Sequence, residues 1–259
     1  MAKNEKLLKL TAPADAIRAE LELNLHSDYT FENFVVGKAN KMAHAASLAV
    51  AEFPGKAYNP LYIWGDSGFG KTYLLNAIAN RALELNPNLN IICLSAEKFV
   101  NKFFRAVQDE KLPQFQKELG GTDMLLVDDV QFLEGKGQSQ EKFLEIFDIL
   151  QKNGRQIVLA SDRMPSDFED MSEGLVHRFC YGLVADIQKP GKALRAAILK
   201  KRAELRKTSV PDDVIQFLAQ KIKSDLWELG RALDRIIVNS EVQRQPITVE
   251  NAAEWIKGA

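Results

Sequence analysis

One eight-residue segment, Gly65–Thr72, constrains the fold of this chain more than any other. It reads GDSGFGKT and fits the pattern G-x-x-x-x-G-K-[ST]. The glycines let the backbone turn tightly, so that successive N–H groups point at phosphate oxygens. Lys71 supplies a charge to the β- and γ-phosphates, and Thr72 offers a hydroxyl to Mg²⁺. The residues that we expect to contact the nucleotide here are Gly65, Gly68, Phe69, Gly70, Lys71 and Thr72.

Short apolar runs alternate with amphipathic stretches on both sides of this loop. The runs lie at 61–64, 91–94, 124–127, 157–160 and, less sharply, 181–187. Continuous apolar runs separated by helices are typical of a parallel sheet that is covered on both faces. The first run precedes the phosphate loop and a helical stripe follows it, which is the context that such a loop requires. We predict an α/β domain built on five strands.

The strand signal disappears beyond residue 189. The remaining sequence predicts helices at about 190–207, 211–222, 225–243 and 248–257. Ser224 is the expected N-cap of the third helix, and Thr248 begins the fourth. We therefore divide the chain into an N-terminal extension or linker (1–28), an α/β nucleotide-binding domain (29–188) and a helical lid (189–259).

Composition excludes several classes of protein. Hydrophobic residues make up 46% and charged residues 27%, which is ordinary for a globular protein. No apolar run is long enough to span a bilayer and no signal peptide is present, so we expect a cytoplasmic protein. Cys93 and Cys180 lie in apolar stretches and are expected to be reduced core thiols.

The net charge of −1 argues against simple electrostatic binding of DNA. Basic residues are nevertheless concentrated between Lys189 and Lys207, with Glu204 as the single acid. Two alternatives remain open: a solvated helix face, or a surface for phosphates or an acidic neighbour.

Acidic residues follow two of the predicted strands. Asp128 and Asp129 come directly after 124–127, and Asp162 comes shortly after 157–160. Ligands of open α/β sheets bind at the carboxyl ends of the strands. We assign Asp128 to the Mg²⁺ site and Asp129 to orienting or deprotonating the attacking water. Asp162 is either a turn residue or a polar sensor beside the γ-phosphate.

Several further segments resemble the AAA+ ATPase domain of the bacterial replication initiator DnaA. They are 29–37 (YTFENFVVG), 54–61 (PGKAYNPL), 128–133 (DDVQFL), 161–163 (SDR) and 182–187 (GLVADI). The similarity runs from about residue 28 to about residue 257. It implies an AAA+ P-loop ATPase: a five-stranded parallel sheet sandwiched by helices, with a C-terminal helical lid.

The resemblance also implies an ATP switch that assembles on origin DNA. It places Val35, Val36 and Gly37 near the adenine of ATP or ADP, and it makes Asp162 the first sensor. Arg178 matches the arginine finger that reaches the ATP of a neighbouring subunit, so the expected partners are further copies or other DnaA-type subunits.

The family carries a helical insertion, here about 97–117, that contacts single-stranded DNA in the assembled filament. Phe104 and Arg105 fall in it and are the expected contacts. The alternative is that Phe104 belongs to the core.

This chain also departs from the family pattern. Trp227 stands where a lid arginine normally senses the γ-phosphate, and an indole offers one N–H and no charge. Arg231, one helical turn further on, is the candidate replacement. Gly174 and Gln138 replace an arginine and a basic residue of the family pattern.

The leading hypothesis is a weak ATPase, converting ATP to ADP and phosphate, that self-assembles in replication initiation. The alternatives are a DnaA-like regulatory adaptor with little or no ATPase activity, or a helicase loader. No helix-turn-helix that would read duplex DNA follows the lid before Ala259. We leave open whether the chain is an excised core or a short, diverged relative.

Overall fold

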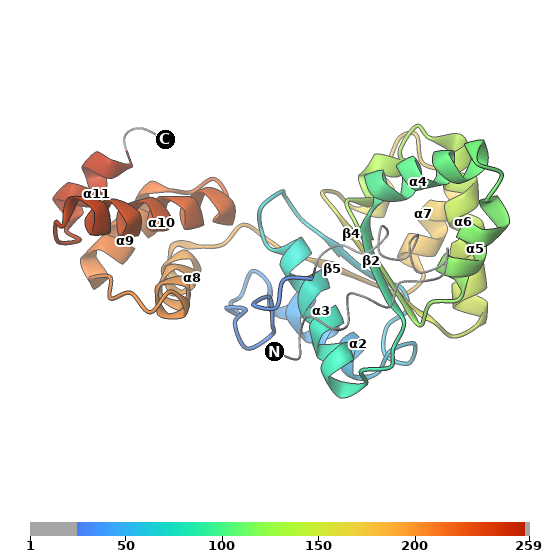
Figure 1. The fold of residues 1–259 in the computed structure, drawn as a ribbon, viewed down its shortest axis with the longest axis horizontal. Helices are drawn as coiled ribbons and strands as arrows, with labels where there is room; N and C mark the ends of the chain where they lie inside the picture. Colours follow the sequence, from blue (N-terminus) through green and yellow to red (C-terminus); the bar gives the residue numbers. More distant parts are fainter. Residues whose placement is uncertain (1–24, 257–259) are drawn as a thin grey trace.

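A computed structural model describes residues 25–256, so part of the N-terminal extension lies outside the described residues. The core is a parallel five-stranded sheet in the order β2-β3-β4-β1-β5 (Figure 1). The strands are β1 (Leu61–Trp64), β2 (Ile91–Ser95), β3 (Met124–Asp128), β4 (Gln156–Ser161) and β5 (Leu183–Asp186). The predicted AAA+ α/β fold is confirmed.

Helices cover both faces of this sheet. They are α2 (Lys41–Glu52), α3 (Lys71–Leu85), α4 (Ala96–Gln108), α5 (Leu112–Gly120), η2 (Val130–Leu133), α6 (Gly137–Lys152), η3 (Pro165–Asp167) and α7 (Glu173–Cys180). One apolar cluster joins the sheet to α2 and α3, and a second joins its other face to α4, α5, α6 and α7. In β2, Ile91 and Cys93 enter the first cluster while Ile92 and Leu94 enter the second. The runs are continuous because successive side chains point to opposite, covered faces.

Strand register places the sequence motifs at one edge of the sheet. Trp64 is the partner of Ser161, and Ser95 is the partner of Asp128. The residues that follow β1, β3 and β4 therefore leave the sheet side by side. This edge carries the phosphate loop and the acidic residues.

Four helices after β5 form a separate group, visible beside the sheet in Figure 1. They are α8 (Lys192–Leu205), α9 (Asp212–Lys221), α10 (Leu226–Gln243) and α11 (Val249–Trp255). Their apolar side chains make a third cluster with no residue from the sheet. The predicted order of elements is confirmed, while the domain boundaries at 28 and 188 stay predictions.

Internal contacts occupy much of the basic segment 189–207. The Arg195 side chain is buried and donates to the carbonyl oxygens of Ala219 (2.9 Å) and Pro190 (2.5 Å). Arg202 and Arg206 both bind Asp234 of α10, at 2.6 and 2.9 Å. Asp234 of the lid is therefore the acidic partner of Arg202 and Arg206.

Two local predictions were wrong. Asp225, not Ser224, caps α10: its carboxylate accepts from the N–H of Glu228 at 2.6 Å, while the Ser224 hydroxyl binds the Glu228 side chain. Cys93 is buried as predicted, but Cys180 is exposed. It ends α7 directly after the buried Phe179, and one residue along a helix turns the side chain to another face.

Within residues 25–256, no helix combines the length and apolar character needed to cross a membrane.

Candidate functional site

The phosphate loop joins β1 to α3 and needs its glycines. Gly68 and Gly70 have positive φ angles of 78° and 103°, which favour glycine. A Cβ on Gly65 would lie 2.3 Å from the carbonyl oxygen of Ile187, so close packing also requires glycine there. Among the described residues, no side chain caps the N-terminus of α3. Its first N–H groups are therefore available to an anion.

Lys71 is buried, with 6% of its surface exposed. Its ammonium donates to the carbonyl oxygens of Gly65 (2.6 Å) and Asp66 (3.0 Å). Burial lowers the pKa of Lys71, and the nearby carboxylates, Asp128 first among them, oppose that shift. The Lys71 side chain therefore lies against the phosphate loop, and a bound phosphate could replace its two neutral carbonyl partners.

Thr72 and Asp128 meet across 56 residues of sequence. The Thr72 hydroxyl donates to Asp128 Oδ2 at 2.5 Å, and the N–H of Asp129 donates to Oδ1 at 3.0 Å. Burial raises the pKa of Asp128, while the Thr72 hydrogen bond acts in the opposite direction. The first turn of α3 and the end of β3 thus bring two hard oxygen atoms together beside the phosphate loop.

Asp129 adopts a left-handed conformation (φ 55°, ψ 49°) just after β3. This conformation is uncommon for a residue with a Cβ and turns the chain sharply out of the sheet. The Gln131 side chain donates to Asp129 Oδ1 at 3.0 Å. The two adjacent aspartates therefore have different partners: Asp128 accepts from Thr72 of α3, and Asp129 accepts from Gln131.

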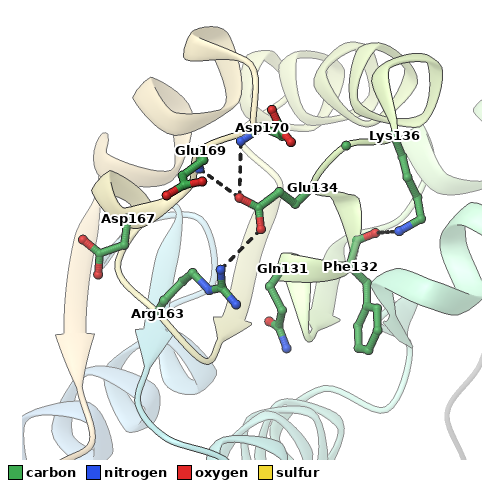
Figure 2. A pocket seen from close by; sticks show the side chains of 9 residues that line it. Gln131, Phe132, Glu134, Lys136, Arg163, Asp167, Glu169 and Asp170 are labelled. Atoms are coloured by element: carbon green, nitrogen blue, oxygen red, sulfur yellow. Dashed lines mark hydrogen bonds and ion pairs between the residues drawn. The ribbon is translucent and has the colours of Figure 1, made fainter.

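Asp162 lies at the expected edge but is engaged by its own neighbour. Arg163 donates to both carboxylate oxygens, through Nε at 2.8 Å and Nη2 at 3.2 Å. The same guanidinium reaches Glu134 at 3.3 Å, as Figure 2 shows. An arginine that holds both oxygens leaves the carboxylate less free than an unpaired sensor would be.

The segment predicted to meet the adenine is fixed by Asn40. The Asn40 side chain accepts from the N–H of Gly37 (2.8 Å) and donates to the carbonyl of Val35 (3.0 Å). Val36, between them, is 45% exposed. Leu194 of α8 packs against Gly37, where an added Cβ would lie 2.9 Å from it. This segment therefore lies between the sheet domain and the lid helices.

The lid touches the phosphate loop through the start of α10. The N–H of Leu226 donates to the carbonyl of Gly68 at 3.1 Å. Trp227, the next residue, is 69% exposed, and the Arg231 guanidinium lies 5.4 Å from the centre of its ring. The arginine one turn along thus lies over the tryptophan and folds back toward the start of the helix.

Comparison with known proteins identifies the family. The family model described as the bacterial DnaA ATPase domain matches residues 25–186, more than half of the chain. The chain belongs to the DnaA family. Domain III of the replication initiation protein DnaA from Thermotoga maritima is 37% identical with a TM-score of 0.88, over 91% of this chain and 98% of that one.

Two further DnaA structures were determined with an ATP analogue. The AMPPCP-bound DnaA from Aquifex aeolicus is 31% identical (TM-score 0.77), with 86% of this chain and 70% of that chain covered. A replication initiator DnaA bound to AMPPCP and single-stranded DNA is 32% identical (TM-score 0.78), with the same coverage. This chain is a DnaA-type AAA+ core.

Arg178, the candidate finger of this DnaA-type core, lies on α7 and is bound within its own chain. It donates to both carboxylate oxygens of Asp148 on α6, at 3.0 and 3.1 Å. Both side chains are partly exposed, by 37% and 46%. At the phosphate loop the structure brings together Lys71, Thr72 and Asp128. Arg178 instead makes its contacts between α7 and α6.

The helical insertion predicted between the second and third strands corresponds to α4 and α5. Phe103 is buried and Phe104 is 43% exposed, so the core alternative for Phe104 is wrong. Arg105 and Val107 are exposed beside it. A single turn of this DnaA-type helix therefore presents an aromatic ring and a cation to solvent.

Sequence reasoning missed three residues that organise the site. Gln131, Arg163 and Asn40 make hydrogen bonds to predicted site residues. Gln131 and Arg163 lie in the segments 128–133 and 161–163 that carry the family resemblance, but none of the three was assigned a role from the sequence. The available signal was proximity, since each stands within three residues of an assigned position. That signal alone could not say where an amide or a guanidinium points.

Proposed function

We propose that this chain is an ATP switch of the DnaA type, which binds ATP with Mg²⁺, hydrolyses it slowly to ADP and phosphate, and assembles with further subunits in the initiation of replication. The observation that carries the proposal is the 2.5 Å hydrogen bond between Thr72 and Asp128. It joins the phosphate loop to the acidic end of β3, which is the pairing that P-loop ATPases use.

Nucleotide binding has the firmest support. DnaA relatives were solved with AMPPCP, and the loop here has its positive φ glycines, an uncapped helix start and Lys71 in place. We assign the phosphates to 65–72 and the adenine to Val35, Val36 and Gly37. Leu194 and Leu226 bring the lid to both segments, which supports a lid that covers the nucleotide.

The residues beside the loop also fit a magnesium ion. Thr72 and Asp128 offer a hydroxyl and a carboxylate oxygen, and Mg²⁺ prefers oxygen ligands with few of them from protein. We propose that these two residues hold it. A bound Mg²⁺ would offset the negative charge of the phosphates.

Asp129 is the proposed residue for orienting or deprotonating the attacking water, with Asp162 as the sensor. Asp129 is one methylene shorter than the glutamate common in fast AAA+ motors, so it should position water less well. We therefore propose slow turnover. An Asp129→Glu variant with unchanged or lower turnover would count against this argument.

Assembly through Arg178 is the proposed route by which hydrolysis becomes dependent on a neighbour. A cation supplied in trans to the transferring phosphoryl group raises turnover by orders of magnitude. The pairing of Arg178 with Asp148 in the single chain supports a surface position. Assembly would have to exchange this contact for one to the ATP of the next subunit.

Single-stranded DNA is a proposed ligand of α4. A DnaA relative was solved with single-stranded DNA. The exposed Phe104 ring next to Arg105 offers a stacking surface and a cation, the two features that bind single strands without sequence preference.

A regulatory adaptor is the second candidate. It is favoured by Trp227, which stands exposed at the position of the family's lid arginine. Gly174 on α7, in place of a second arginine, points the same way. In that case nucleotide would be a bound structural ligand, and the chain would dock on an intact initiator.

Turnover measured against protein concentration separates the two. The assembling ATPase predicts that turnover per subunit rises with concentration and that Arg178→Ala abolishes the rise. Flat turnover near background, together with tight nucleotide binding, would support the adaptor instead.

A further inference from the structure

Gln131 connects the ends of two neighbouring strands at the site. It lies in η2, two residues after Asp129, and is half-buried. Gln131 and Arg163 both line a hollow of about 500 Å³. Figure 2 shows the two side chains. No role for Gln131 follows from the phosphate loop or from the acidic pairs.

The amide of Gln131 is oriented by its partners. Its Oε1 accepts from the Ser161 hydroxyl (3.2 Å) and from the backbone N–H of Asp162 (3.4 Å). A backbone N–H can only donate, so the oxygen of the amide must face β4 and the NH₂ group must face away from it. That NH₂ group donates to Asp129 Oδ1 at 3.0 Å. The orientation therefore follows from chemistry.

One oxygen of Asp129 is left for other partners. Within residues 25–256, Oδ1 accepts from Gln131 and Oδ2 accepts no hydrogen bond. A carboxylate held at one oxygen keeps a fixed rotation, so the second oxygen has a defined direction. Fixing a catalytic group by a supporting hydrogen bond is a general requirement for aiming it at a reacting atom.

We propose that Gln131 is a positioning residue for hydrolysis. It holds Asp129 so that Oδ2 faces the attacking water, and its hydrogen bonds to the end of β4 fix Asp129 relative to that strand. The inference rests on the proposed ATPase activity. Asp162, whose N–H binds Gln131 while Arg163 holds its carboxylate, is thereby linked to Asp129 through one amide.

A purely structural role is the competing explanation, in which Gln131 only ties η2 to β4. The isosteric variant Gln131→Glu separates the two roles. At pH 8 a glutamate keeps both acceptor contacts to β4, but it loses the donor to Asp129 and places a second negative charge beside that carboxylate. A tie to β4 would survive this change, whereas a positioning role would not.

The test compares Gln131→Glu, Gln131→Leu and wild type in single-turnover ATPase assays at pH 8, with AMPPCP affinity measured by calorimetry. We expect turnover to fall roughly tenfold to a hundredfold in both variants, a range typical of residues that orient a catalytic group. AMPPCP affinity should stay within about twofold, since the amide contacts no residue of the phosphate loop. Gln138→Leu, an exposed glutamine in the first turn of α6, is the control for a lost amide.

A double-mutant comparison decides whether the effect passes through Asp129. In an Asp129→Asn background, Gln131→Leu should cause no further loss, because the group that it positions is gone. Three results would overturn the inference: full turnover in Gln131→Glu, a parallel loss of AMPPCP affinity, or an equal loss in the Asp129→Asn background. Wild-type turnover no higher than that of Asp129→Asn would instead overturn the proposed hydrolysis, and this inference with it.

Discussion

The guanidinium of Arg178 on α7 donates two hydrogen bonds, of 3.0 and 3.1 Å, to the carboxylate of Asp148 on α6. Bidentate pairing of this kind fixes the geometry of an arginine more firmly than a single contact. The residue proposed to act on a neighbour's ATP is therefore held by its own subunit, and the proposed assembly would have to compete with this pair for the guanidinium.

Removing either Arg178 or Asp148 should affect assembly more than the free energy of unfolding. Exposed ion pairs contribute about 0–1 kcal/mol, so Arg178→Ala and Asp148→Asn should each lower the free energy of unfolding by less than about 1 kcal/mol. Turnover at a series of protein concentrations should lose its concentration dependence in Arg178→Ala and reach its plateau at lower concentration in Asp148→Asn. Arg81→Ala, which breaks another exposed pair on α3, is the control. Concentration-dependent turnover in Arg178→Ala would contradict the assignment.

Lys71→Met should separate binding from folding. Within residues 25–256 the buried Lys71 ammonium has no carboxylate in hydrogen-bonding contact, so its removal should leave the free energy of unfolding within about 1 kcal/mol. Affinity for ATP should fall by at least about 2 kcal/mol, roughly thirtyfold, because a charge-assisted bond to phosphate is lost. Calorimetric titration measures the affinity for ATP, and urea unfolding measures the stability. Lys41→Met, at an exposed position on α2, is the control. Equal losses of binding and stability would indicate a folding defect.

Asp128→Asn should stabilise the nucleotide-free protein in a pH-dependent way. Burial raises the pKa of Asp128 in the folded state above its unfolded value. Well below pH 3.8, its ordinary pKa, the Asp128 carboxyl is protonated in both states and does not destabilise the fold. As pH rises, the unfolded chain ionises first, and wild-type stability falls until the folded group also ionises. Urea unfolding should therefore show a larger advantage for the variant at pH 8 than at pH 4. An advantage that is constant or larger at pH 4 would reverse the assigned direction.

Arg231 and Trp227 should both respond to whether ATP or ADP is bound. If the guanidinium stacked over Trp227 reaches the γ-phosphate, Arg231→Ala should weaken ATP binding about threefold to tenfold while leaving ADP binding unchanged. Trp227 fluorescence should then respond more strongly to ATP than to ADP, with Trp227→Phe identifying the signal against Trp64 and Trp255. Arg235→Ala, one turn further along α10, is the matched control. Equal weakening of ATP and ADP would argue against γ-phosphate sensing.

Phe104→Ala should weaken binding to single-stranded DNA. Loss of one stacking ring costs about 1–3 kcal/mol per base, so the affinity for oligo-dT should fall by roughly fivefold or more. Arg105→Ala should lower the salt dependence of binding as well as the affinity. Fluorescence anisotropy across a salt series measures both, with the exposed Phe53→Ala as the control. Identical affinities for Phe104→Ala and Phe53→Ala would remove α4 from the proposed DNA path.

The parts of the site that could be predicted are those formed by residues that are consecutive in the sequence. The loop at 65–72 and the pair Asp128–Asp129 each follow an apolar run, and parallel strands bring such ends to one edge. Ser224 and Cys180 were misjudged because a cap or a buried face depends on one residue of register, which a periodic pattern does not resolve.

Sequence by itself determined the α/β class, the phosphate loop, the acid at the end of β3 and the helical lid, because these depend on local pattern and on the period of apolar residues. Only the tertiary structure decided that Gln131 faces Asp129, that Arg178 is bound to Asp148 and that Arg231 lies over Trp227. Each of these contacts depends on how a side chain is directed by the elements around it. Such directions are set by packing and by competition among hydrogen-bond partners, which residue spacing alone does not specify.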